Sequence, residues 1–428
     1  MHIETVKLSV SELTLGMQVV KLDRPWLDTP FLLQGFRIRT VEELRQLREL
    51  CAYVYVDIHH GITPPAGRGE RVMLDEDGQV VEIQRKLTAH AQRVQKPVTR
   101  TDPAALPPRA VDYPVDVPFD EELPRAQQAI TTTKRVLRQL VEALRDGATP
   151  SLEPLKQAAT QLLESMLRNP DPALLLRALR GTEPFSFCHP VNSAILALTV
   201  GRGLGLRRPA LHDLALGLLL ADLGKLRLPV DLLRASRRLD RRETEMVKLH
   251  VQHSVDIATE LGGLNAAALE VLAAHHERFD GSGYPRGLRG GEIPLLARIA
   301  ALADAFDAIT SERGYSAPVA VHEAVQELYA ATVPVFQREL VEALIQGLGT
   351  HPVGCLVELV DGCVALVVGQ NRARRLLPVV LLLTDAARQP LAQRRLRDLA
   401  ADGGPAVRAV LAPGEHGFGA PGPDVLYA

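Results

Sequence analysis

HHERFDGSGYP, residues 275–285, is the stretch of this 428-residue chain that says most about its fold. Its two adjacent histidines offer imidazole nitrogens, which are common protein ligands for transition metals. Its glycines permit positive φ and let the backbone come close to another group. Alone, such a run is typical of a tight surface turn beside a solvated helix end. Its meaning depends on what accompanies it along the chain.

Other residues of the kinds that bind metals flank this run on both sides. His189 and His250 lie upstream, as does Asp222 in the segment ADLGK, while Asp304 lies downstream in ALADAFDAIT. A single histidine or aspartate on a helix is more often a core, surface or capping residue than a ligand. It is the set as a whole, in this order, that points to a metal centre.

In order and spacing, these residues resemble the HD-GYP family of metal-dependent phosphodiesterases, which cut the bacterial second messenger cyclic di-GMP. The resemblance is strongest between Phe185 and about Leu348, and the motif HHERFDGSGYP is its most specific part. The N-terminal stretch KLDRPWLDTPFLLQGFRI also resembles a domain that often precedes HD-GYP domains. The resemblance therefore implies an all-α HD-type domain and a hydrolase that acts in signal transduction.

The resemblance also implies a set of metal ligands. It maps them onto His189, Asp222, His250, His275, His276 and Asp304. Two divalent ions of the Fe, Mn or Zn type would share Asp222 as a bridge, with His189 and Asp304 on the first ion and the other three histidines on the second. Mixed imidazole and carboxylate ligands suit such ions.

Catalytic and substrate-binding roles follow from the same resemblance. Asp222 and Lys225 would be catalytic, with Lys225 three residues further along the same helical face and close to the phosphate. The implied substrate-binding residues are Gly283, Tyr284, Pro285, Arg286 and Arg313. Tyr284 offers a face for stacking on guanine, and the arginines suit phosphates or guanine edges. Gly224 would let a backbone or a substrate come close.

One position departs from the family pattern, because Ala221-Asp222 stands where the family has His-Asp. A methyl group cannot bind metal, so the first site keeps at most three protein ligands, and one ion instead of two is an alternative. Three outcomes stay open: hydrolysis of cyclic di-GMP, binding without hydrolysis as a sensor, or a protein-interaction platform for diguanylate cyclase domains. We favour the phosphodiesterase, since the loss of one position is unlike a long-decayed site.

Composition limits the class of protein. The formal net charge of −2 gives no global basic field, which argues against a nucleic-acid polymer as partner. Four scattered cysteines without CxxC spacing suit a reducing compartment. The N-terminus lacks the pattern of a signal peptide, and the aliphatic stretch 379–383 is too short to span a bilayer. We expect a cytoplasmic protein without a membrane span, and a homodimer is an open alternative.

The chain reads as a multidomain α+β protein. Residues 1–60 mix strand-like segments, 18–22 and 54–58, with a helical pattern over 41–50, which predicts a small α/β domain. Residues 61–122, rich in proline, glycine and charge, predict a linker. Helical patterns over 123–350 predict the all-α domain, and 351–428 predict a C-terminal β-hairpin region with an irregular tail.

Overall fold

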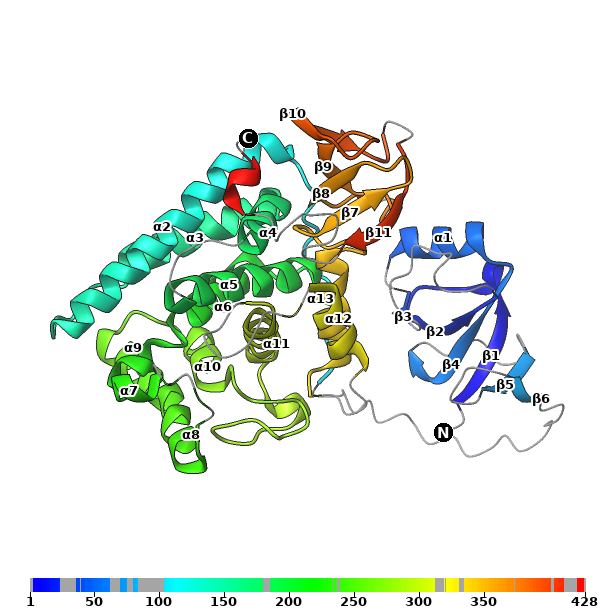
Figure 1. Cartoon of the computed structure of the whole chain (residues 1–428). Coiled ribbons are helices and arrows are strands. Elements are labelled where there is room, and N and C mark those ends of the chain that lie inside the picture. Colours follow the sequence, from blue (N-terminus) through cyan, green and yellow to red (C-terminus); the bar gives the residue numbers. More distant parts are fainter. Residues whose placement is uncertain are drawn as a thin grey trace, which may run out of the picture. The chain divides into compact units, whose positions relative to one another are not determined.

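Figure 1 shows the chain as a computed structural model in two compact units, residues 1–100 and 101–428. The structure describes residues 3–23, 36–38, 40–61, 70–74, 80–83, 104–179, 185–233, 235, 237, 239–311, 319, 321–330, 335–372, 374–401, 404–411 and 422–426. Among these residues, no helix combines the length and the apolar character needed to cross a membrane.

The N-terminal unit is a six-stranded antiparallel sheet with one helix. Its strand order is β3-β2-β4-β1-β5-β6, and the helix, α1 (Val41–Leu50), has the range that the helical spacing predicts. A capping box between Thr40 and Glu43 fixes the start of α1, and Leu47 on its inner face is fully buried. The strands are β1 (Ile3–Ser9), β2 (Met17–Leu22), β3 (Phe36–Arg37), β4 (Tyr53–Gly61), β5 (Glu70–Leu74) and β6 (Val80–Ile83). The small N-terminal α/β fold is confirmed.

The region predicted as a linker contains ordered structure at both ends. Strands β5 and β6 pair with each other, and β5 pairs with β1, so they belong to the N-terminal sheet. Residues 104–118 run in extended form along the helical unit, where buried polar side chains hold them. Tyr113 donates to the carbonyl of Leu206 at 2.9 Å, and Arg298 donates to that of Ala104 at 2.8 Å. A composition rich in proline and glycine thus accompanies an extended segment docked on a domain.

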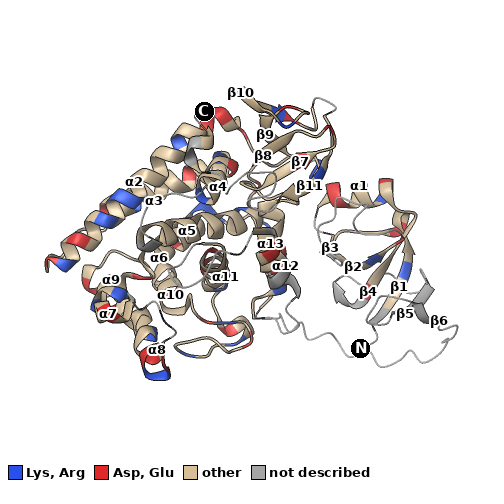
Figure 2. Ribbon diagram, in the orientation of Figure 1, with Lys and Arg blue, Asp and Glu red and all other residues tan. Residues whose placement is uncertain are grey.

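The second unit is mainly helical. Its helices are α2 (Phe119–Arg145), α3 (Glu153–Arg168), α4 (Asp171–Ala178), α5 (Phe185–Gly203), α6 (Arg208–Leu220), α7 (Val230–Leu233), α8 (Arg241–Lys248), α9 (His250–Leu261), α10 (Ala266–Ala274), α11 (Leu295–Thr310), α12 (Val321–Ala330) and α13 (Arg338–Leu348). Helix α5 packs against α6, α11 and α13, and its apolar residues around Ile195 are fully buried. An apolar helix of this kind forms the centre of a helical domain. Figure 2 shows basic and acidic residues interspersed along the outer helices, as the small net charge predicts.

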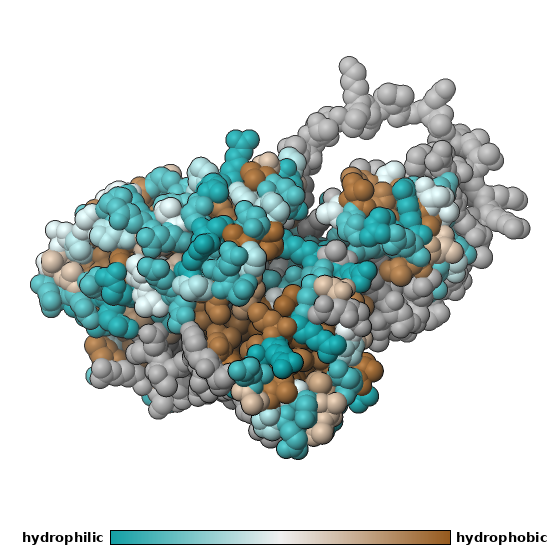
Figure 3. Space-filling model, turned by 90° about the horizontal axis from the view of Figure 1, so that it is seen from above, coloured by the Kyte–Doolittle hydropathy of each residue, from teal (hydrophilic) through white to brown (hydrophobic). Residues whose placement is uncertain are grey.

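A five-stranded antiparallel sheet completes this unit, in the order β10-β9-β8-β7-β11. The predicted hairpin is confirmed: β7 (Leu356–Leu359) pairs with β8 (Val364–Gly369) around Asp361-Gly362, and Gly362 has a φ of 91°. Strand β9 (Val379–Thr384) pairs with β8, as the sequence predicts, and β10 (Pro390–Asp398) and β11 (Val407–Leu411) extend the sheet on its two sides. In the view of the molecular surface in Figure 3, hydrophilic residues cover much of the visible face, with hydrophobic areas between them.

Candidate metal centre

Three imidazoles converge between α9 and α10. His250 is the first residue of α9, and His275 and His276 directly follow the last residue of α10. One ring nitrogen of each residue can be chosen so that all three lie within 4.8 Å of one another. His250 and His275 are buried, at 1% and 0% exposure. The structure therefore brings together the three histidines that were predicted to share a metal ion.

The backbone fixes the orientation of two of these rings. His250 donates from Nδ1 to the carbonyl of Val247 at 2.6 Å, and His275 donates from Nδ1 to the carbonyl of Leu272 at 2.8 Å. A carbonyl oxygen only accepts, so Nδ1 carries the proton and Nε2 keeps its lone pair. Among the residues that the structure describes, the buried Nε2 atom of His275 has no hydrogen-bond partner. A buried acceptor beside two other imidazoles fits a metal ligand.

The environment keeps these histidines neutral. Burial lowers the pKa of His250 to about 4, and burial also lowers the pKa values of His275 and His276. Only the neutral imidazole binds a metal ion, because the protonated ring has no lone pair to donate. The chain thus holds all three rings in the form that a divalent cation requires.

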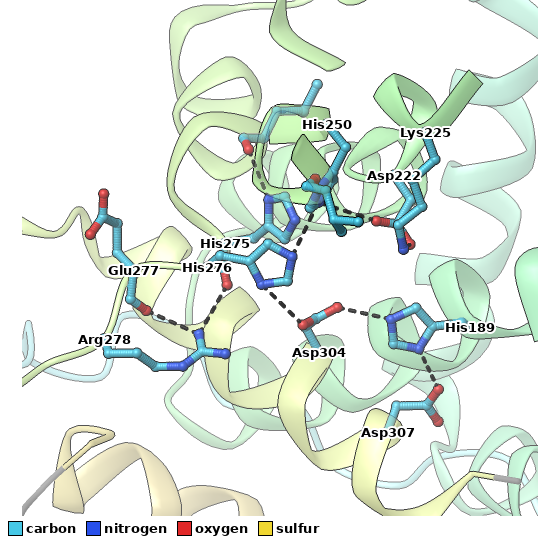
Figure 4. A network of polar contacts seen from close by, with 12 residues as sticks. His189, Asp222, Lys225, His250, His275, His276, Glu277, Arg278, Asp304 and Asp307 are labelled. Atoms are coloured by element: carbon cyan, nitrogen blue, oxygen red, sulfur yellow. Dashed lines mark hydrogen bonds and ion pairs between the residues drawn. The ribbon is translucent and has the colours of Figure 1, made fainter. Parts of the chain in front are cut away.

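Asp304, on α11, connects the three imidazoles to His189 on α5. Its Oδ1 lies 2.9 Å from Nε2 of His189, and its Oδ2 lies 3.6 Å from Nδ1 of His276 (Figure 4). Nε2 of His276 lies in turn 3.2 Å from Nε2 of His250. Burial would raise the pKa of Asp304, but its hydrogen bond to His189 holds that pKa well below its usual range. The Asp304 carboxylate is therefore negatively charged, and it lies between His189 and the cluster of three histidines.

Asp222 and Lys225 lie on the other side of His250. The Nζ of Lys225 is 2.7 Å from Oδ2 of Asp222, and Nε2 of His250 is 3.6 Å from its Oδ1 (Figure 4). Burial raises the pKa of Asp222, but the nearby charges of Lys225 and His189 outweigh it and hold the pKa well below its usual range. Five of the six predicted ligands are thus linked by hydrogen bonds or ion pairs, and the ring of the sixth, His275, lies 4.1 Å from that of His276, centroid to centroid.

The ADLGK turn sits tightly against α9. A Cβ on Gly224 would lie 2.0 Å from the carbonyl oxygen of His250, so this position requires glycine. The hydroxyl of Ser254 donates to the carbonyl of Ala221 at 2.6 Å and accepts from the Gly224 amide at 2.8 Å. The close approach predicted at Gly224 is to the backbone of α9. Ala221 itself is buried at the end of α6, beside Asp222.

Two residues that position His189 were not among the predicted site residues. Asp307 contacts His189 directly, and Arg177 acts through Asp307. Asp307, one helical turn after Asp304, accepts from Nδ1 of His189 at 2.8 Å and pairs with Arg177 of α4 at 3.2 Å. Burial lowers the pKa of His189, but hydrogen bonds to Asp304 and Asp307 outweigh it and raise the pKa to about 10. The i, i+3 spacing of Asp304 and Asp307 was a visible signal, whereas nothing in the sequence indicated Arg177.

A buried carboxylate shapes the loop that follows the two histidines. Glu277 is fully buried and accepts from the amides of Arg286 and Leu288 at 2.8 and 2.9 Å. The amide of Tyr284 donates to the carbonyl of His276 at 3.2 Å. A Cβ on Gly283 would lie 2.3 Å from the Arg278 amide, so this glycine lets the loop fold back on its own start. The ligand pair and the loop are therefore one packed unit.

The predicted substrate-binding residues of this loop differ in their exposure to solvent. Pro285 and Arg286 are exposed, whereas Tyr284 is half-buried. The ring of Tyr284 lies 4.7 Å from that of His276, centroid to centroid, at an interplanar angle of 30°, so the imidazole covers one face. Only the other face remains for a base. Arg313 falls outside the residues that the structure describes.

We expect Glu277→Ala to loosen this loop. The change leaves two amides without their acceptor, at a cost of about 1–3 kcal/mol for each. Amide hydrogen exchange at Arg286 and Leu288 should become faster, while the α5 amides keep their protection. Glu292→Ala is the matched control, because Glu292 also accepts from a loop amide, that of Arg289, at an exposed site. Equal exchange in native and Glu277→Ala chains would contradict this role.

Two known protein families match parts of this chain, and one of them covers the residues of the candidate metal centre. Residues 161–333 match the family described as HD domain, and residues 5–155 match a domain of unknown function, DUF3391. The first range contains the whole histidine and carboxylate network together with HHERFDGSGYP. Residues 161–333 therefore form an HD domain of the HD-GYP type. Within this domain, alanine at position 221 is the departure from the ligand pattern.

Several characterised proteins resemble this HD-GYP chain. A cyclic di-GMP phosphodiesterase of Pseudomonas aeruginosa is 29% identical over 91% of this chain and 87% of its own length. The cyclic di-GMP phosphodiesterase response regulator RpfG of Xanthomonas campestris is 32% identical over 52% of this chain and 59% of its own. A 3′3′-cGAMP-specific phosphodiesterase of Vibrio cholerae is 38% identical over 30% and 24%. Among solved structures, an HDG"Y"P protein from Bdellovibrio bacteriovorus aligns with a TM-score of 0.44 and 16% identity, over 79% of this chain and 98% of that one.

Proposed function

We propose that this HD-GYP protein is a metal-dependent phosphodiesterase that hydrolyses cyclic di-GMP in bacterial second-messenger signalling. The observation that carries the proposal is the cluster of three neutral imidazoles beside the Asp222–Lys225 pair. The Pseudomonas aeruginosa relative, which aligns over 91% of the chain, is named for this activity and supports it. The Vibrio cholerae relatives named for 3′3′-cGAMP make that dinucleotide the substrate to compare.

The proposal assigns the metal to named side chains. His250, His275 and His276, with Asp222, would hold one ion of the Fe, Mn or Zn type, and His189, Asp222 and Asp304 would hold a second. A bound divalent ion supplies a hydroxide nucleophile at neutral pH and stabilises charge on the phosphoryl oxygens. The second set has fewer protein ligands because position 221 is alanine, and His189, whose pKa is raised to about 10, must lose a proton before it can bind an ion. We therefore propose that it is the weaker site.

The other groups bind and orient the substrate. The Lys225 ammonium, 2.7 Å from Asp222, is placed to donate a hydrogen bond to a phosphate oxygen. Asp307 and Arg177 hold the His189 ring in one orientation. Exposed Pro285 and Arg286 would meet the nucleotide first, with Gly283, Tyr284 and Arg313 contributing the rest of the loop surface. Contacts with diguanylate cyclase domains, a homodimer and a cytoplasmic location remain predictions.

A cyclic di-GMP sensor without turnover is the second candidate function. Ala221 is the observation that favours it, because loss of a ligand lowers metal affinity while leaving the loop at 281–288 intact. The platform for protein contacts is a weaker alternative, since the three imidazoles keep the neutral state that a metal ion requires. Measurable hydrolysis of cyclic di-GMP would distinguish the phosphodiesterase from the sensor and from the platform.

The test compares the native chain with Ala221→His, each loaded with Mn or Fe, in hydrolysis of cyclic di-GMP and of 3′3′-cGAMP. We expect turnover in the native chain and faster turnover in Ala221→His, since the added imidazole completes the second metal site. Turnover in Ala221→His alone, with tight nucleotide binding to both, would support the sensor instead. Metal content measured on the same samples reports the number of ions per chain.

A further inference from the structure

Lys248 is a cation beside the candidate site that none of the roles above uses. It is the last residue of α8 and lies two residues before His250. Its Nζ lies 5.3 Å from the centroid of the Tyr284 ring, within the range of a cation–π contact. Because His276 covers one face of that ring, the ammonium takes the other. It therefore occupies the ring face on which a guanine would have to stack.

The contacts of Lys248 leave its ammonium available to an anion. Its ion pair with Glu245, at 2.7 Å, is on the surface, where the glutamate side chain is 61% exposed. Such pairs contribute little, about 0–1 kcal/mol. Another nearby cation, Arg278, is held differently, because its guanidinium donates to the carbonyl of Glu277 at 3.1 Å and lies over the Phe336 ring. Lys248 can exchange partners, whereas Arg278 supports the loop.

A cyclic dinucleotide carries two phosphodiester groups, and the proposed reaction uses one of them. The cleaved group is assigned to the metal ligands and Lys225, which leaves the second anion to be neutralised elsewhere. Lys225 contacts Asp222 on one side of His250, and Lys248 contacts Tyr284, whose ring lies 6.5 Å from that of His250. Two lysines thus border the histidine cluster through different neighbours.

We propose that Lys248 binds the second phosphate of the cyclic dinucleotide and so selects two-phosphate substrates over simple phosphodiesters. This inference rests on the proposed function. Tyr284 then acts as a positioning residue, which holds the ammonium on one face and stacks on His276 with the other. Binding of substrate replaces the exposed contact with Glu245 by a charge-assisted hydrogen bond to phosphate.

The experiment measures kcat and KM of the Mn-loaded full chain with cyclic di-GMP and with bis(p-nitrophenyl) phosphate, which has a single phosphate. Lys248→Met should lower kcat/KM for cyclic di-GMP, mainly through KM, by about 10 to 100-fold more than for the simple diester. Lys248→Arg should restore most of the loss. Glu245→Gln, which removes only the counterion, should leave KM for cyclic di-GMP unchanged or lower it.

Other outcomes overturn the inference. If Lys248→Met lowers kcat/KM equally for both substrates, Lys248 contacts the cleaved phosphate or supports folding. If it lowers kcat/KM for neither substrate, Lys248 does not bind substrate. If the native chain cleaves neither substrate, the proposed function fails, and equilibrium binding of cyclic di-GMP to native and Lys248→Met chains decides instead. Equal affinities, or no binding to the native chain, would then refute a role for Lys248.

Discussion

His275→Ala is expected to remove metal binding and with it the hydrolysis of cyclic di-GMP. The Nε2 of His275 is buried and has no hydrogen-bond partner in the described part of the chain, and its ring is held by the carbonyl of Leu272. Because the ring is fixed in this way, the substitution removes one ligand nitrogen from the proposed metal site. We expect turnover to fall by more than about 100-fold, since even residues that only support ligands contribute about 10 to 100-fold.

The measurement is metal content after reconstitution and dialysis, together with turnover. His253→Ala is the matched control, because it removes an imidazole from the same helix as His250, at a half-exposed position beside Asp256. The control should keep both its metal and its activity. Equal metal retention by the two variants would contradict the assignment of His275 as a ligand.

Arg177→Met is expected to destabilise the helical unit strongly. Arg177 and Asp307 are both buried, and their ion pair, at 3.2 Å, joins α4 to α11. Arg177 also donates to the hydroxyl of Thr310 at 2.7 Å. Methionine keeps the volume but leaves Asp307 with His189 in place of two cationic partners, and breaking a buried pair in this way costs about 3–5 kcal/mol. Because Asp307 holds His189, metal affinity should fall as well.

Urea unfolding followed by far-ultraviolet circular dichroism reports this loss. Arg227→Met is the control, since Arg227 pairs with Glu260 at the surface of the same unit. An exposed pair contributes about 0–1 kcal/mol, so this variant should unfold close to the native midpoint. If Arg177→Met unfolds no earlier than Arg227→Met, the buried pair does not stabilise the domain as proposed.

Local sequence signals predicted much of the fold. Helix α1 has its predicted range because Thr40 and Glu43 form a capping box ahead of an amphipathic pattern. Asp240 and Glu243 start α8 in the same way. The β7–β8 hairpin follows from Asp361-Gly362, where glycine accepts positive φ. These elements depend on residues within a few positions of each other, which is the range that sequence reasoning covers.

Elements that depend on distant partners were not predicted. Strand β10, whose sequence is PLAQRRLRD, lies at the edge of its sheet, so polar residues obscure the alternation that would mark it. Residues 104–118 have no regular pattern, and contacts from Arg298 and Tyr113 hold them instead. Strands β5 and β6 lie within the region predicted as linker. In each case the deciding contact comes from another part of the chain.

For the site, the motif order predicted which residues meet but not how they are held. Five of the six candidate ligands are joined by polar contacts and His275 packs beside His276, while their role as ligands stays a prediction. Arg177 escaped notice because an arginine on a helix carries no signal for a partner 130 residues away in sequence. Stacking of guanine on Tyr284 stays a prediction, and His276 covers one side of that ring.

Hydrolysis of cyclic di-GMP by the purified, Mn-loaded chain, measured beside Asp222→Ala, tests the central claim most directly. Asp222 contacts both His250 and Lys225, so its loss removes a proposed metal ligand and releases the lysine. We predict that the native chain releases a linear or mononucleotide product and that Asp222→Ala does not. The same low level of product from both chains, at full metal loading of the native chain, would contradict the assignment as a phosphodiesterase.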